Sequence, residues 1–88
     1  MKFSFVITKS FDKNLRKLSP TEQKQVAQKL KVMQLNPYHP SLRTKKIKGF
    51  KDLFECSVNM DIRILWQYKE NHIILILDIE HHSIVDNL

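Results

Sequence analysis

The sequence predicts an α+β fold, β-α-α-β-β-β(-β), with an N-terminal helical hairpin packed on one face of a single antiparallel sheet. Three observations predict it. Apolar residues alternate at the start of the chain, helical spacing with a clear start signal follows, and alternating apolar segments fill the second half. The chain has 88 residues, a single glycine and no polar low-complexity tract. We therefore expect one ordered domain over residues 1–88.

The segment KFSFVIT near the N-terminus alternates apolar with polar residues, which is the period of a half-buried strand. A short amphipathic helix is expected next. Phe11, Leu15 and Leu18 recur there at helical spacing, and Ser10 before them suits an N-cap. The chain should therefore pass directly from a first strand into a helix.

The second helix has the strongest start signal in the sequence. Ser19 suits the N-cap, Pro20 the first helical position, and Glu22 completes a capping box. The helix should end at Asn36-Pro37, and its apolar face contains Val26, Leu30 and Met33. Two helices joined by so tight a turn form a helical hairpin.

Three closely spaced strands are predicted after residue 52. LFECSV and DIRILWQY alternate apolar with polar residues, whereas HIILILDIE is apolar on both faces in its middle and should be central. Short connections at 59–60 and 69–71 favour antiparallel hairpins. An edge strand is expected around residues 45–48, before a turn at Gly49.

Alternation also predicts which side chains lie on the face of the sheet away from the helices. They are polar or charged and lie beside a basic loop: Glu55, Ser57, Arg63, Asp78, Glu80 and His82. His81 has the opposite parity, which favours a partly buried histidine. The two histidines could exchange roles if the strand bulges there.

The formal net charge is +6, and the excess is concentrated in one loop. Five basic residues occur within nine positions, with no acid among them: Arg43, Lys45, Lys46, Lys48 and Lys51. Such a cluster attracts phosphate groups or an acidic protein partner. A solvated loop that keeps the protein soluble is the other interpretation.

Several classes of protein are disfavoured. The N-terminal apolar run is too short for a secretory signal, and the longest apolar run, 73–77, is too short for a membrane span. Cys56 is the only cysteine and cannot form an internal disulfide, so we expect a cytoplasmic protein. The histidine spacing does not suit a metal site, and no cofactor is expected.

The polar face carries residue types that cut RNA without a metal. This reaction needs a base for the 2′-hydroxyl proton, an acid for the leaving 5′-oxygen and positive charge on the phosphorane-like transition state. A histidine, an arginine and a carboxylate cover these roles, and Arg63 shares this face with His82. The structural alternative for Arg63 is a surface ion pair with Asp61, Asp78 or Glu55.

The order and spacing of three segments carry a resemblance over essentially the whole chain. FVITKSFDKNLRKLSP, LRTKKIKGFKDLFECSVNMDIRILWQY and ILILDIEHHSIVD resemble the RelE/ParE superfamily of type II toxin–antitoxin toxins, especially RelE-, YafQ- and HigB-like mRNA interferases. The resemblance implies a microbial ribonuclease fold that cuts mRNA in the ribosomal A site without a metal. It also implies a cognate antitoxin that holds the toxin inactive.

The same resemblance implies roles for individual residues. Arg63 matches the family's phosphate-contacting arginine, and His82 matches the histidine of the G-T-H-x-x-L-F ending in the YafQ-like branch, as general acid or base. Asp61 matches an acidic residue that is functional in that branch, and Glu55 is another candidate base. His81 is then expected to pack, and the basic loop to bind RNA.

The sequence departs from the family pattern at two places. The lysine pair that RelE-like members carry on the LFECSV strand is replaced by Glu55 and Ser57, and the aromatic that stacks on an RNA base falls at Asp86. Loss of that stacking would forfeit about 1–3 kcal/mol. The main alternative is a ParE-like inhibitor of DNA gyrase without ribonuclease activity, and the Arg63, His82 pair on one face is the feature against it. The two departures favour a third interpretation, a basic binding module that has lost activity.

Overall fold

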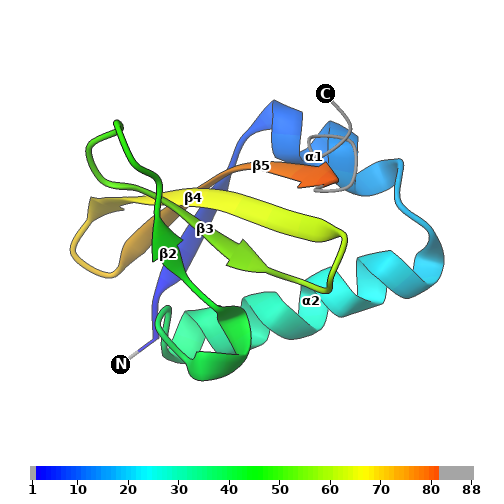
Figure 1. The fold of residues 1–88 in the computed structure, drawn as a ribbon, viewed down its shortest axis with the longest axis horizontal. Coiled ribbons are helices and arrows are strands. Elements are labelled where there is room, and N and C mark those ends of the chain that lie inside the picture. The colour runs from blue at the N-terminus through cyan, green and yellow to red at the C-terminus, as the bar shows by residue number, and fades with distance from the viewer. Residues whose placement is uncertain (1, 82–88) are drawn as a thin grey trace.

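Two helices, one short 3-10 helix and five strands are formed by residues 2–81, the part of the chain that the computed structural model describes (Figure 1). In chain order they are β1 (Ser4–Ile7), α1 (Lys9–Arg16), α2 (Pro20–Leu35), η1 (Pro40–Leu42), β2 (Lys45–Lys46), β3 (Leu53–Ser57), β4 (Ile62–Glu70) and β5 (Ile73–His81). The α+β class, the helical pair and the short edge strand are confirmed.

The sheet is mixed, which corrects the expectation of a single antiparallel sheet. Its order is β1-β5-β4-β3-β2, and β1 pairs with β5 in parallel, with Ser4 opposite Ile73 and Ile7 opposite Ile76. The other neighbours pair antiparallel, as their short connections require. The first strand has no local hairpin partner, and the helices and remaining strands separate it from β5 along the chain. Its direction is therefore decided by tertiary packing.

One face of the sheet packs against both helices. Phe11 of α1 and Val26 and Met33 of α2 are buried together with side chains that share this face: Phe54, Cys56, Ile62, Ile64, Trp66, Ile74, Ile76 and Ile79. In Figure 1, α2 is the long helix in cyan that crosses below the sheet. Neither helix covers the opposite face, which leaves its polar side chains accessible.

The helix starts show one confirmed prediction and one that is wrong. The capping box of α2 is present, because Ser19 Oγ accepts from the Glu22 N–H at 3.1 Å and Glu22 Oε1 accepts from the Ser19 N–H at 2.9 Å. The N-cap of α1 is Thr8 and not Ser10, since Thr8 Oγ1 accepts from the Phe11 N–H at 3.0 Å. Thr8 also donates to the Leu77 carbonyl, so packing against β5 selects this cap.

A bulge in β5 lies next to Asp78. Leu65 pairs with Asp78 and Trp66 with Ile76, which leaves Leu77 as an extra residue. The carboxylate of Asp78 is held by α1, where Asn14 Nδ2 and Ser10 Oγ donate to it at 2.6 and 2.9 Å. Asp78 keeps the predicted parity, opposite Leu65 and two residues from Glu80, but its carboxylate is engaged by α1.

Candidate functional site

A pocket of about 470 Å³ opens on the uncovered face of the sheet, beside β2. We name it the carboxylate pocket. It combines four cationic side chains with two carboxylates, and its lining residues are Lys45, Lys46, Ile47, Lys48, Glu55, Arg63 and Glu80. Arg63 and Glu80 lie directly opposite each other on β4 and β5, so the strand register brings together residues far apart in sequence.

Arg63 is oriented by its own hairpin. Its Nη1 donates to the carbonyls of Asn59 at 2.8 Å, Ile62 at 3.3 Å and Met60 at 3.4 Å. Among residues 2–81 the ion pairs are Asp12–Arg16 and Lys45–Glu55, so no carboxylate neutralises this guanidinium there. Because a guanidinium has five N–H donors, others remain for an anion such as phosphate.

Glu55 projects from β3 toward the edge strand. Its cross-strand neighbours are Leu65 on β4 and Lys45 on β2. Glu55 Oε1 lies 3.2 Å from Lys45 Nζ, and the Glu55 side chain is 15% exposed against 70% for Lys45. The carboxylate is thus placed by the sheet, whereas the lysine reaches it from solvent.

A second pocket, of about 350 Å³, shares Arg63 with the carboxylate pocket. We name it the hairpin pocket, because the β3–β4 hairpin forms much of it. Its lining residues are Lys29, Ser41, Arg43, Ser57, Val58, Asn59, Met60 and Arg63. Lys29 was not singled out by the sequence, because helical periodicity places it only on a polar part of α2. Its position beside the hairpin comes from the packing of α2 and η1.

The remaining candidate residues do not line these pockets. Asp61 is exposed in the β3–β4 turn, where its N–H donates to Asn59 Oδ1, and Lys51 is exposed before β3. His81 is half-buried and pairs with Ile62, on the side of the sheet that faces the helices. His82 and Asp86 lie outside the described residues.

Comparison with known proteins identifies the family. A family model described as the ParE toxin of type II toxin–antitoxin systems matches residues 5–85. This chain is a toxin of that family. It therefore belongs to the RelE/ParE superfamily of type II toxin–antitoxin toxins, as the sequence motifs predict. None of the curated proteins compared with it matches significantly.

Solved structures share the fold of this toxin. RelE–RelB from Pyrococcus horikoshii superposes with a TM-score of 0.80 at 18% identity, over 94% of this chain and 98% of the other. The RelB–RelE complex from Methanococcus jannaschii gives 0.75 at 18%, over 93% and 95%. A YoeB/ParE toxin from Agrobacterium tumefaciens gives 0.76 at 11%, over 93% and 99%. At such low identity these likenesses support the fold alone.

The other chemically distinctive groups of the toxin do not point to a second reaction centre. Cys56 is buried, and burial followed by the nearby Glu55 charge raises the pKa of its thiol to about 12, so it stays protonated. No group of three His, Cys, Asp or Glu within 2–81 could hold a metal ion. No helix in this range is long and apolar enough to span a bilayer.

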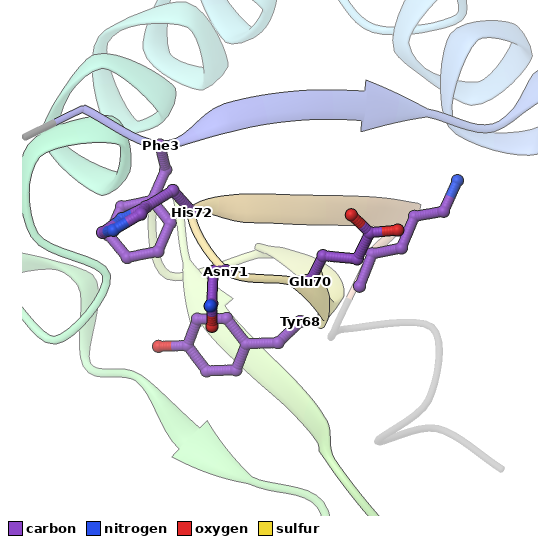
Figure 2. A pocket seen from close by; sticks show the side chains of 6 residues that line it. Phe3, Tyr68, Glu70, Asn71 and His72 are labelled. Atoms are coloured by element: carbon purple, nitrogen blue, oxygen red, sulfur yellow. The ribbon is translucent and has the colours of Figure 1, made fainter.

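A third pocket of the toxin, shown in Figure 2, lies at the end of β4 farthest from Arg63 and has a different character. The Phe3 ring lies 5.5 Å from that of His72 and 6.1 Å from that of Tyr68. Burial, with Tyr38 nearby, raises the pKa of Tyr68 to about 12. This pocket combines aromatic rings with one cation and one carboxylate, Lys69 and Glu70, in contrast to the mainly cationic pockets around Arg63.

Proposed function

We propose that this toxin is a metal-independent endoribonuclease that cuts mRNA in the ribosomal A site and thereby inhibits translation in the cytoplasm. The observation that carries the proposal is the carboxylate pocket. It holds an arginine without an ion pair among the described residues, together with Glu55 and three lysines. A carboxylate can move a proton, and the cations can stabilise the charge that develops on phosphorus.

The reaction needs no external reactant. A base removes the proton of a ribose 2′-hydroxyl, and the resulting oxygen attacks the adjacent phosphorus. The bond from phosphorus to the 5′-oxygen breaks, an acid protonates that oxygen, and a 2′,3′-cyclic phosphate remains. Arg63 contacts the phosphate and stabilises the phosphorane-like transition state through charge-assisted hydrogen bonds.

The reaction needs two proton-transfer groups. We assign His82 as general acid or base, with Glu55 or Asp61 as the complementary group. Of the two carboxylates, Glu55 is favoured by its place in the carboxylate pocket, since Asp61 lines neither pocket. In this proposal His81 packs toward the helices. The bulge at Leu77 interrupts the regular alternation of β5 before it reaches His81.

In this proposal the same basic residues bind the RNA strand and, in the inactive toxin, the antitoxin. Lys45, Lys46 and Lys48 line the carboxylate pocket, with Arg43 and Lys51 nearby in sequence. These side chains hold RNA phosphates by charge. We further propose a cognate antitoxin whose acidic segment covers the same residues. The archaeal relatives described above were solved as complexes of RelE with RelB.

Primer-extension mapping of cellular mRNA after brief induction tests the proposal. We expect in-frame cuts with the wild type and with Asn71→Ala, an exposed turn residue distant from Arg63. The cuts should disappear with Arg63→Gln and with His82→Ala. Unbroken mRNA under the wild-type toxin, or cuts that persist in both variants, would contradict the assignment.

The second candidate function is inhibition of DNA gyrase without RNA cleavage. It is favoured by the family match, which is to the ParE toxin. Plasmid supercoiling followed in the same induced cultures separates the two candidates. Loss of supercoiling before any fall in protein synthesis, with intact mRNA, would support the gyrase inhibitor.

A further inference from the structure

We infer that the hairpin pocket is a second phosphate site, which holds a backbone phosphate of the RNA strand next to the carboxylate pocket, with which it shares Arg63. The inference rests on the proposed ribonuclease function, since it names RNA as the ligand. It assigns phosphate binding to Lys29, and it places Arg43 in the hairpin pocket, apart from the lysines of the carboxylate pocket.

The lining charges of the two pockets differ. The carboxylate pocket has two glutamates among its cations, whereas no acid lines the hairpin pocket within residues 2–81. Lys29, Arg43 and Arg63 come to this pocket from α2, the end of η1 and β4, so three separate elements bring cations to one place. Such a pocket attracts an anion, and the Ser41, Ser57 and Asn59 side chains add groups that can hydrogen-bond to it.

The pocket is held in shape by contacts between its own walls. Lys29 Nζ donates to the Ser41 carbonyl at 3.3 Å, which ties α2 to η1. Arg63 Nη1 donates to the Asn59 carbonyl at 2.8 Å, which ties the arginine to the hairpin. Lys29 and Arg63 are therefore positioned before a ligand arrives, which lowers the ordering cost of binding.

Arg43 occupies an unusual backbone conformation. Its φ of 50° and ψ of 44° place it in the left-handed region, at the C-cap of η1, where its N–H donates to the Pro40 carbonyl at 3.2 Å. Glycine and asparagine adopt this region more readily than arginine. The side chain of Arg43 is therefore not required for this turn, which separates a binding role from a structural one.

The class of ligand follows from Arg63, which lines both pockets. Arg63 belongs to both pockets, so a strand with regularly spaced phosphates can place one phosphate in each. A phosphate in the hairpin pocket would orient the neighbouring nucleotide toward Glu55. A free carboxylate would satisfy the charge but supplies no second anion for the other pocket. The pair of pockets therefore fits a polynucleotide.

The test measures binding of a fluorescently labelled 2′-O-methyl RNA oligonucleotide, which lacks the attacking hydroxyl and cannot be cut. Fluorescence anisotropy gives Kd over a range of salt concentrations for the wild type, Arg43→Asn, Lys29→Gln and the double variant. Lys24→Gln is the matched control, because Lys24 is exposed on α2 and lines neither pocket. Thermal unfolding checks that each variant is folded.

We expect the double variant to bind about fourfold more weakly near 0.15 M salt, with the salt slope reduced by about 0.7, the value for one phosphate on a single strand. Arg43→Asn should unfold at the same temperature as the wild type or higher, because asparagine tolerates its backbone conformation. Lys24→Gln should keep the wild-type Kd and slope.

Three results would overturn the inference. They are an absence of wild-type binding to this RNA, an unchanged Kd in the double variant, and an equal loss in Lys24→Gln. A double variant that keeps RNA affinity but loses affinity for a polyglutamate peptide would assign the pocket to an acidic protein instead. Failure of the proposed function looks different, because RNA would bind through Arg43 and Lys29 while cellular mRNA stayed intact.

Discussion

The Nζ atom of Lys45 lies 3.2 Å from Oε1 of Glu55, across the short ladder between β2 and β3. This contact places a lysine against the carboxylate that we assign to proton transfer. It also means that the edge strand, although only two residues long, helps to shape the carboxylate pocket.

Glu55→Gln should abolish most RNA cleavage while keeping the fold. Loss of a general base or acid costs about 10²-fold to 10⁴-fold in rate, whereas a solvent-accessible ion pair contributes at most about 1 kcal/mol to stability. Cleavage of mRNA in a cell-free translation reaction and denaturant unfolding measure the two effects. Glu70→Gln, at the far end of β4, serves as the control. Full activity of Glu55→Gln would remove this residue from the chemistry.

Arg63→Lys should not preserve activity, although it keeps the charge. A lysine ammonium cannot hold the hairpin carbonyls and also present the planar donor pair of a guanidinium to phosphate. We expect a loss of about 10²-fold in cleavage rate, within the range for removing a transition-state donor. Arg16→Lys, in an exposed ion pair with Asp12, is the conservative control. A wild-type rate for Arg63→Lys would show that charge alone suffices.

Asp78→Asn should destabilise the fold by about 1.5–3 kcal/mol at neutral pH, the range for a hydrogen bond to a charged group. Asp12→Asn, the matched control, breaks only an exposed ion pair and should cost less than about 0.5 kcal/mol. Urea unfolding of the three proteins at pH 7 measures the difference. Equal effects of the two substitutions would show that the contacts of Asp78 with α1 contribute little.

The contribution of Asp78 should also depend on pH. Burial raises its pKa, but hydrogen bonds from Asn14, the Ile79 N–H and Ser10 outweigh burial and leave the pKa below the ordinary value of 3.8. A carboxyl with a lowered folded-state pKa stabilises fully above its ordinary pKa, and this stabilisation is lost as the pH falls through the folded-state value. The stability gap between wild type and Asp78→Asn should therefore narrow below pH 3.8. A gap that widens there would contradict the sign.

The Cys56 thiol should be inert in the folded protein. It is fully buried, and burial raises its pKa to about 12, so thiolate is scarce at any pH that keeps the protein folded. We expect a thiol-specific reagent such as DTNB to label the unfolded chain at once at mildly alkaline pH and the native toxin only at the rate of unfolding. Immediate labelling of the native protein would show that the core opens around β3.

The elements that sequence reasoning predicted well depend on neighbours in the chain. Ser19, Pro20 and Glu22 lie within one helical turn, so the start of α2 is a local property. The β3–β4 hairpin is likewise local, because its strands are joined by residues 58–61. Arg63 and Glu55 were assigned to the same face by simple alternation along their strands, and both line the carboxylate pocket.

The features that sequence reasoning missed depend on contacts between distant segments. Thr8 replaces Ser10 as the N-cap of α1 because it also bonds to Leu77, and the Asp78 carboxylate accepts hydrogen bonds from Ser10 and Asn14 of α1. No periodicity within α2 could have shown that Lys29 lies in the hairpin pocket.

The sequence by itself determined the family, the α+β class, the capping box of α2 and the alternation that puts Arg63 on an uncovered face, because these depend on short-range patterns and on motif order. Only the tertiary structure decided that β1 runs parallel to β5. It also decided that Arg63 lines two pockets of different charge. The physical reason is that strand partners and pocket walls come from segments tens of residues apart. Their meeting is selected by burial of the shared core, which local sequence does not encode.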